Sequence, residues 1–225
     1  MSHAINHFIQ PIVSVDLTIN KYEILARPVD CDTDLQTYFN ELDAESSFAV
    51  FMEQIHIAEQ IFDKYQVPCS INISGPLIHN ETVRQKVLGI CLAFQHILKG
   101  LEFSEKYELP PPALFNEFLQ GIRATNISII LDDFGTGEAG FGSISDYSFD
   151  EVKLDRELIH DIQHRQHKVN ILKQLANMLN VLNFTTTIEG IENQTQLDML
   201  SSIGFEFFQG FHLGRPFNSQ ELLYA

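Results

Sequence analysis

Eight short apolar segments, separated by segments of helical pattern, constrain the fold of this 225-residue chain more than any other feature. The apolar segments are rich in β-branched and aliphatic residues, as strands are, and they lie at 8–15, 21–27, 69–74, 98–105, 127–131, 150–155, 185–191 and 205–210. The helical patterns cover 34–65, 81–94, 110–122, 158–182 and 193–203. Strands that alternate with helices predict a largely parallel sheet. Eight of them predict an α/β fold, a (β/α)8 TIM barrel, with residues 1–225 as a single domain.

Polar residues stand at or near the carboxyl end of nearly every predicted strand. They are Glu23, Asn72, Glu102, Asp132, Asp133, Lys153, Asp155, Glu189 and Gln209. In a (β/α)8 barrel these strand ends meet on one face, where the working residues of such barrels lie. Many carboxylates on one rim, with almost no compensating base, are costly to desolvate and repel one another. The sequence therefore predicts a cation at this rim.

The apolar segment 127–131 runs directly into Asp132 and Asp133, and a Gly-Thr-Gly turn follows. Its composition predicts a strand that is buried on both faces. One interpretation is that Asp132 or Asp133 caps the next helix, because aspartate is a preferred capping residue. The other acidic strand ends favour a metal site in which Asp132 bridges two ions and Asp133 binds the second.

The predicted donor set consists of hard oxygen ligands, which suit Mg²⁺ or Mn²⁺. The predicted ligands are Glu23, Asn72, Glu102, Asp132, Asp133 and Glu189. Five carboxylates exceed the needs of one ion, so we expect two ions, which activate water for hydrolysis of a phosphate ester or diester. Lys153 would steady this water or the developing charge, and Glu189 would take the proton. A Schiff base at Lys153 is disfavoured, because the acids keep its amine protonated.

The composition excludes several classes of partner and site. The formal net charge of −16 argues against nucleic-acid polymers and membrane surfaces as partners. No apolar run approaches the roughly 20 residues of a membrane span, and three widely spaced cysteines predict a reducing, cytoplasmic location. His160, His164 and His167 recur at helical spacing, but their hydrophilic surroundings favour an exposed helix face over a metal site.

The strand-end residues belong to motifs that resemble the EAL domain, a bacterial phosphodiesterase family that acts on cyclic di-GMP. The motifs occur in the family's order at 23–25 (Glu-Ile-Leu, with Arg27), 72–74, 102–105, 132–137 (Asp-Asp-Phe-Gly-Thr-Gly), 153–155, 189–192 and 209–210. The resemblance runs from Gln10 to Pro216. It implies a modified barrel with one antiparallel strand, which fits Pro11 in the first strand, since proline is confined to edges, ends and bulges.

The resemblance also implies roles for individual residues. Those at Glu23, Asn72, Glu102 and Asp132 hold one ion, and those at Asp132, Asp133 and Glu189 hold the second. Lys153 and Asp155 orient the attacking water, Glu189 is the general base, and Gln209 lies near metal-bound water. Gln10, Leu25 and Arg27 contact the substrate, while Glu105 and Glu192 organise loops. The implied reaction converts cyclic di-GMP to linear pGpG.

Two segments depart from the family pattern. The segment 28–48 lacks motifs that usually follow the first glutamate, and 138–140 reads Glu-Ala-Gly where Tyr-Ser-Ser is usual. The second segment belongs to a loop that couples dimerisation to metal binding in the family. A second hypothesis therefore stays open: a weak or inactive module that acts as a cyclic di-GMP receptor or binds a protein partner. The complete ligand set favours the enzyme, and a homodimer is compatible with both.

Overall fold

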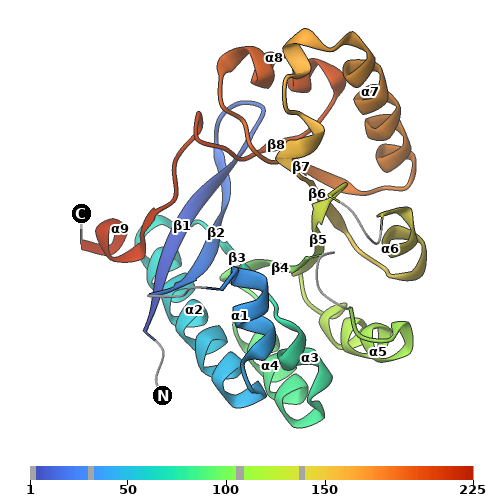
Figure 1. The fold of residues 1–225 in the computed structure, drawn as a ribbon. Helices are drawn as coiled ribbons and strands as arrows, with labels where there is room; N and C mark the ends of the chain where they lie inside the picture. The colour runs from blue at the N-terminus through green and yellow to red at the C-terminus, as the bar shows by residue number, and fades with distance from the viewer. Residues whose placement is uncertain (1–3, 30–32, 105–108, 137–139, 225) are drawn as a thin grey trace.

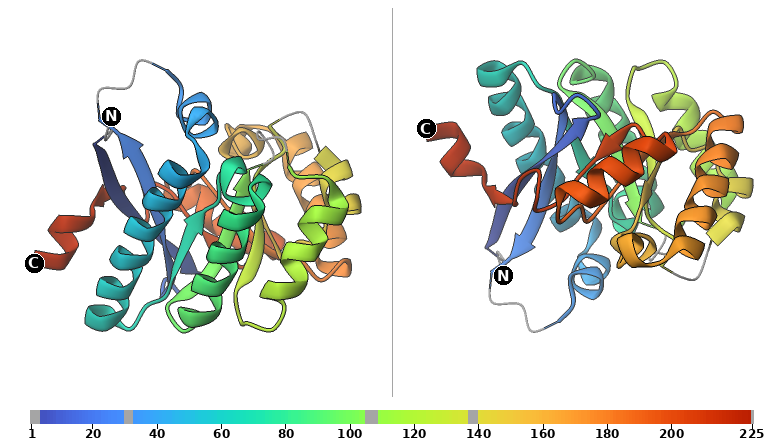
Figure 2. Two further views of the ribbon diagram at one scale, coloured as in Figure 1. Left: turned by 90° about the horizontal axis from the view of Figure 1, so that it is seen from below. Right: turned by 90° about the horizontal axis from the view of Figure 1, so that it is seen from above.

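The computed structural model of the chain describes residues 4–29, 33–104, 109–136 and 140–224. Its strands form one sheet in the order β2-β3-β4-β5-β6-β7-β8-β1, and β1 also pairs with β2, so eight strands close into a barrel. The bounds are β1 Ile5–Ser14, β2 Ile19–Pro28, β3 Cys69–Asn72, β4 Leu98–Ser104, β5 Ser128–Phe134, β6 Glu151–Leu154, β7 Thr185–Ile188 and β8 Phe207–Phe208. Helices surround this barrel (Figure 1, Figure 2). The predicted α/β barrel is confirmed.

Strand β1 runs antiparallel to both of its barrel neighbours, whereas β2 to β8 pair in parallel. The expected single antiparallel strand is therefore confirmed. Residues 8–9 of β1 also pair with a short ninth strand, β9 (Phe217–Asn218), and residues 13–14 pair with β8. Pro11 lies between these two pairings, where β1 has no ladder on that side among the described residues. A residue without an N–H group is tolerated at such a position.

The helices are the least accurately predicted elements. Their bounds are α1 Leu35–Glu41, α2 Ala44–Tyr65, α3 Gly75–His79, α4 Glu81–Ala93, α5 Pro112–Ile122, α6 Gly140–Asp146, α7 Gln166–Val181, α8 Gln194–Ile203 and α9 Ser219–Tyr224. Helices α4, α5 and α8 confirm the ranges predicted for them. The short helices α3, α6 and α9 and the strand β9 were not predicted, because segments of so few residues carry little periodicity.

The predicted helix over 34–65 is two helices, so that prediction was wrong in its continuity. Asp43 separates them, and its carboxylate accepts a hydrogen bond from the backbone N–H of Ser46 at 2.7 Å. This is a side-chain cap, which satisfies an N–H group that has no partner within the helix. Asp34 caps α1 in the same way, through the N–H of Thr37. Both caps lie next to the predicted site, because α1 and the first turns of α2 line it.

The predicted helix over 158–182 begins later, and two 3₁₀ turns, Arg156–Leu158 and Ile162–His164, precede α7. His160 therefore lies outside any helix, His164 ends a 3₁₀ turn and His167 lies in the first turn of α7. All three are exposed. The prediction of one shared helix face was wrong, although the expectation of exposed side chains holds.

A buried ion pair occupies the barrel interior. The ammonium of Lys21 on β2 lies 2.8 and 2.7 Å from the two carboxylate oxygens of Glu151 on β6. Thr187 on β7 donates its hydroxyl to Glu151 Oε1 at 2.7 Å. Each of these residues stands two positions before a predicted site residue, which lies on the same strand for Lys21 and Glu151 and directly after the strand for Thr187. Because side chains alternate along a strand, the group forms the layer of the barrel directly below the site.

No helix in the described part of the chain has both the length and the apolar character needed to cross a bilayer.

Candidate metal and substrate site

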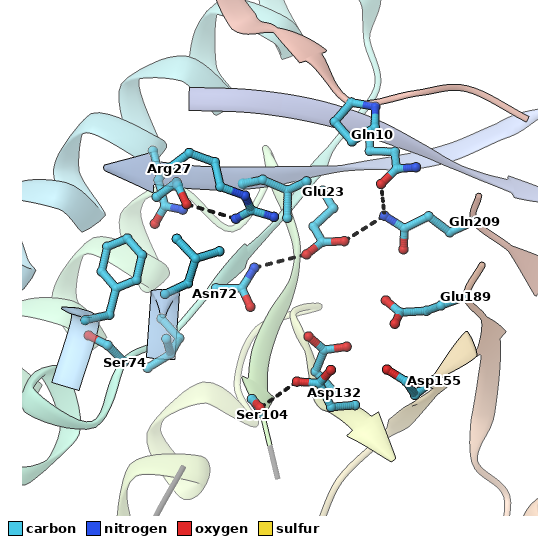
Figure 3. Close-up of a pocket in the computed structure, with 18 of the residues that line it drawn as sticks. Gln10, Glu23, Arg27, Asn72, Ser74, Ser104, Asp132, Asp155, Glu189 and Gln209 are labelled. Atoms are coloured by element: carbon cyan, nitrogen blue, oxygen red, sulfur yellow. Dashed lines mark hydrogen bonds between the residues drawn. The ribbon is translucent and has the colours of Figure 1, made fainter. Parts of the chain in front are cut away.

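The carboxyl ends of the strands open onto one pocket of about 790 Å³. The predicted site residues that line it are Gln10, Glu23, Leu25, Arg27, Asn72, Asp132, Asp133, Asp155, Glu189, Glu192 and Gln209. Figure 3 shows Glu23, Asp132 and Glu189 turning their carboxylates toward one space. The structure thus brings together side chains that lie up to two hundred positions apart in the chain.

An irregularity in β5 turns two consecutive aspartates toward the same pocket. Consecutive strand residues normally point to opposite faces of a sheet. Asp133 has a φ of 61°, in the left-handed region, and the pairing of β5 with β6 shifts register between Leu131 and Phe134. Ser104 at the end of β4 donates its hydroxyl to Asp133 Oδ2 at 2.7 Å. The bulge and this hydrogen bond place Asp133 beside Asp132.

Lys153 on β6 is fully buried, and its ammonium group lies among four carboxylates. Its Nζ is 2.7 Å from Glu102 Oε2, 2.8 Å from Glu189 Oε1, 3.0 Å from Glu23 Oε2 and 3.1 Å from Asp132 Oδ1. The sequence predicts a protonated Lys153 among the acids, but not its direct contact with four carboxylates at once. One positive charge cannot neutralise four carboxylates, so the cluster still favours an additional cation.

Burial and neighbouring charges move the pKa values of the carboxyl groups in opposite directions. Burial, followed by repulsion from Glu23, raises the pKa of Glu102 to about 8. Burial raises the pKa of Asp132 to about 6 against the attraction of Lys153, and it raises that of Glu189 well above its usual value. At Glu23, Lys153 and two amide hydrogen bonds outweigh burial and lower the pKa to about 2. The cluster therefore contains one firmly ionised carboxylate and three that hold protons more readily.

Amide side chains fix the orientation of Glu23. Gln209 donates to Glu23 Oε2 at 2.7 Å, and Asn72 donates to Glu23 Oε1 at 3.1 Å. Gln10 accepts from Gln209 at 3.2 Å and donates to the carbonyl of Gly214 at 2.9 Å. Figure 3 shows these bonds linking β1, β2 and the end of β8. Strand β1, which runs antiparallel to its neighbours, thus contacts the acidic cluster through Gln10.

The acids form two groups with the spacing of cation ligands. Within each group one oxygen per residue lies within 4.8 Å of the others, and the groups are Glu23, Glu102 and Asp132, and Asp133, Asp155 and Glu189. Two buried acceptors, Glu102 Oε1 and Gln209 Oε1, have no hydrogen-bond partner among the described residues. Leaving such atoms unpaired is costly, and hard oxygen donors suit hard divalent cations. The residues present therefore fit a pair of divalent cations.

Asp155 joins the second group, although its predicted role was to orient water. It follows β6, and Glu189 follows β7, so the spacing of these two parallel, paired strands at their ends decides how close the two carboxylates come. Beyond these ends Gly190 has a φ of 74°, and a Cβ atom on it would lie 2.3 Å from Cβ of Arg156. Glycine is therefore required next to Glu189.

The remaining predicted residues lie outside the two acidic groups. Leu25 and Arg27 line the pocket at the end of β2, where the Arg27 guanidinium donates to the carbonyl of Ala26 at 2.9 Å. Glu192 also lines the pocket, and its side chain is exposed. Glu105 lies outside the described residues, as does most of the altered segment 138–140.

Several pocket residues were missed by sequence reasoning. Ser104 stands two positions after Glu102 on β4, so strand alternation could have placed both on one face. Helices α1 and α2 add a largely apolar wall that includes Leu35, Phe39 and Phe51. This wall comes from or directly follows the segment that departs from the family pattern, so no motif indicated it.

The sequence matches the EAL domain family over residues 5–216. The cyclic di-GMP phosphodiesterase PdeB of Shewanella oneidensis is 33% identical over 156 residues, which cover 65% of this chain and 17% of that protein. The cyclic di-GMP phosphodiesterase TpdA of Vibrio parahaemolyticus is 27% identical over 145 residues, 64% of this chain and 25% of that protein. The chain thus spans a quarter or less of the length of these relatives.

Solved structures share the fold over nearly the whole chain. A standalone versatile EAL protein from Vibrio cholerae O395, in its c-di-GMP-bound form, has a TM-score of 0.80 at 20% identity and covers 97% of this chain and 94% of its own. A manganese and cy-diGMP complex of Klebsiella pneumoniae BlrP1 has a TM-score of 0.78 at 24% identity, covering 97% and 57%. With the family match running through the entire barrel, this chain belongs to the EAL domain family.

Proposed function

We propose that this chain hydrolyses cyclic di-GMP to linear pGpG with the help of two divalent cations. The observation that carries the proposal is the meeting of six carboxylates, in two groups of three, at one pocket, which all of them line except the fully buried Glu102. The pocket volume falls within the range of small-molecule sites, roughly 300–1,000 Å³. The names of the relatives PdeB and TpdA support the choice of substrate. Bound Mg²⁺ or Mn²⁺ would supply polarisation of a phosphoryl oxygen and a lowered pKa of water.

In this proposal Glu189 acts as the general base. Burial raises the pKa of its carboxyl group, so this carboxylate accepts a proton more readily than an exposed glutamate does. Lys153 lies 2.8 Å from Glu189 Oε1 and would fix this side chain while stabilising negative charge on the phosphoryl group. Asp155 would hold the attacking water, and Gln209 would keep Glu23 in place through its 2.7 Å hydrogen bond.

The nucleotide would extend from the acidic groups toward the end of β2. Gln10, Leu25 and Arg27 line that part of the pocket, and the guanidinium of Arg27 is the cation suited to the second phosphate. Figure 3 shows Arg27 and Ser74 on the far side of Asn72 from Glu189. We also propose that Glu105 and Glu192 organise loops next to the pocket.

A second candidate function is a cyclic di-GMP receptor without turnover. Lys153 favours it, because an ammonium shared by four carboxylates stabilises the cluster in part without cations. Such a receptor would bind the nucleotide in the same pocket and leave it intact. A homodimer and a protein partner are compatible with either candidate, and we propose a cytoplasmic location for both.

Substitution of Glu189 tests the enzyme proposal. We expect Glu189→Gln to lower the rate of pGpG formation by about 10²–10⁴-fold, because the amide cannot accept the proton. The matched control is Glu206→Gln, which makes the same change at an exposed glutamate before β8 and should leave the rate unchanged. Product is measured by chromatography with Mg²⁺ or Mn²⁺, and melting temperature checks the fold. A loss of less than threefold in Glu189→Gln would remove Glu189 from this role.

A further inference from the structure

An exposed aromatic ring stands at the rim of the pocket, next to the end of β8. Phe211 lines the pocket, and 55% of its surface is accessible to solvent. It stands two residues after Gln209, which contacts Glu23 in the acidic cluster. The Phe211 side chain is not part of the hydrophobic core. Because its ring lines the pocket, a role in ligand binding explains this exposed apolar residue.

The loop that carries Phe211 is held rigidly against the end of β7. The backbone of Ile191 donates to the carbonyl of Gln209 and accepts from the N–H of His212, both at 3.0 Å. A Cβ atom on Gly210 would lie 2.2 Å from the backbone nitrogen of Ile191, so only glycine permits this approach. These contacts fix the backbone on both sides of Phe211. The point from which the Phe211 side chain leaves the backbone is therefore set before any ligand arrives.

The ring of Phe211 is also supported by a cation. The guanidinium carbon of Arg215 lies 4.3 Å from the ring centroid, which is a cation–π contact. The N–H of Gly214, the residue before Arg215, donates to the carbonyl of Gly210 at 3.0 Å, so the chain turns back toward Phe211. With Arg215 over the ring, the accessible surface that remains is a flat apolar area at the mouth of the pocket.

We propose that Phe211 is a stacking platform for one purine base of the substrate, with Arg215 bracing the ring. This inference rests on the proposed function, because it takes a cyclic purine dinucleotide as the ligand. Flat aromatic side chains bind bases through stacking, which contributes the equivalent of roughly fivefold to a hundredfold in affinity for each base. The acidic groups would hold the phosphate, and Phe211 would add affinity for the base that they cannot provide.

The absence of tryptophan from the chain permits a direct test. Phe211→Trp keeps a stacking ring and introduces the only indole, whose fluorescence reports on contact with a base. The control is Phe141→Trp, because Phe141 is a similarly exposed ring, 63% accessible, on α6 and outside the residues that line the pocket. Cyclic di-GMP is titrated in Ca²⁺, with binding followed independently by calorimetry. We expect saturable quenching in Phe211→Trp and none in Phe141→Trp.

Truncation of the ring provides the second measurement. Phe211→Ala should weaken the binding of cyclic di-GMP in Ca²⁺ by roughly fivefold to a hundredfold. It should leave unchanged the hydrolysis of bis(p-nitrophenyl) phosphate, a diester without a purine, which shows that the acidic groups are intact. Phe141→Ala should change neither quantity.

The outcomes separate this inference from the proposed function. Unchanged fluorescence of Phe211→Trp at calorimetric saturation, or unchanged affinity of Phe211→Ala, would overturn the platform even if the enzyme hydrolyses cyclic di-GMP. Quenching and weakened binding in a protein that produces no pGpG would support the platform and overturn hydrolysis. A protein that does not bind cyclic di-GMP at all would overturn the platform.

Discussion

At the scale of single residues, the charge balance of the site depends on Lys153. Its buried ammonium contacts four carboxylates, and the pKa of its own amine is raised well above the usual value by those acids although burial opposes the charge. The cluster is consequently arranged around a permanent cation. Additional cations would have to compete for these carboxylates both with protons and with Lys153, which contacts all three residues of the first acidic group.

Metal binding is therefore expected to release protons. Glu102, whose pKa is raised to about 8, holds a proton at neutral pH, and Asp132, whose pKa is raised to about 6, holds one in mildly acidic solution; a divalent cation binds the ionised form of both. As pH rises through this range the competing protons leave, so Mn²⁺ affinity should rise between about pH 6 and pH 8 and level off above it. Calorimetric titration in two buffers of different ionisation enthalpy measures the protons released per ion.

The direction in which Mn²⁺ affinity changes with pH tests this prediction. Glu206→Gln, which alters an exposed carboxylate outside the site, should release the same number of protons as the unchanged protein. Affinity that stays constant or falls from pH 6 to pH 8, with no protons released, would contradict the raised pKa values.

The identities of the site residues could be predicted from sequence, but their electrostatic arrangement could not. Strand ends marked Glu23, Asp132 and Glu189 as neighbours, because parallel strands meet at one rim. The contact of Lys153 with four acids depends on side-chain directions across four strands, which no local pattern contains. The left-handed backbone of Asp133 is equally a tertiary feature.

At the scale of the elements, strands β2, β6 and β7 are joined below the site by Lys21, Glu151 and Thr187. We expect Lys21→Met to lower the free energy of unfolding by about 3–5 kcal/mol, because it leaves the Glu151 carboxylate buried without a cation. The double variant Lys21→Met with Glu151→Leu should recover most of that loss, since apolar replacement of both partners removes the unpaired charge. Urea denaturation of the three proteins measures the difference.

An exposed lysine on a barrel strand provides the matched control. Lys99→Met on β4 makes the same substitution at the surface and should change stability by no more than about 0.5 kcal/mol. If Lys21→Met costs as little as Lys99→Met, the ion pair does not stabilise the barrel. If the double variant is less stable than Lys21→Met, the loss arises from packing and not from charge.

Long elements were predicted well and short ones poorly. Helix α8, which Asn193 caps in the structure, was foreseen because ten helical residues give a clear pattern. The break between α1 and α2 was missed, although Asp43 is of the residue type that caps helices. Tertiary contacts also create elements that sequence patterns do not show, such as β9, which consists of two residues paired with β1.

At the scale of the whole molecule, the barrel brings acids from most of its strands to one face of a chain whose net charge is −16. An anionic dinucleotide approaches such a protein against an unfavourable field, so its binding requires local positive charge. Lys153 beneath the pocket, Arg27 and Arg156 in its lining, and bound cations can supply it. This architecture was predictable from the order of the motifs and from the alternation of strands and helices, because both extend along nearly the full length of the chain.

The central claim is that the acidic cluster turns over cyclic di-GMP with the aid of divalent cations. A single-turnover assay tests it most directly, with purified protein in excess over cyclic di-GMP and the nucleotides separated by chromatography. The account predicts complete conversion to pGpG in Mn²⁺ or Mg²⁺ and none in EDTA. Intact cyclic di-GMP in Mn²⁺, while calorimetry shows that it is bound to folded protein, would contradict the account and identify a receptor.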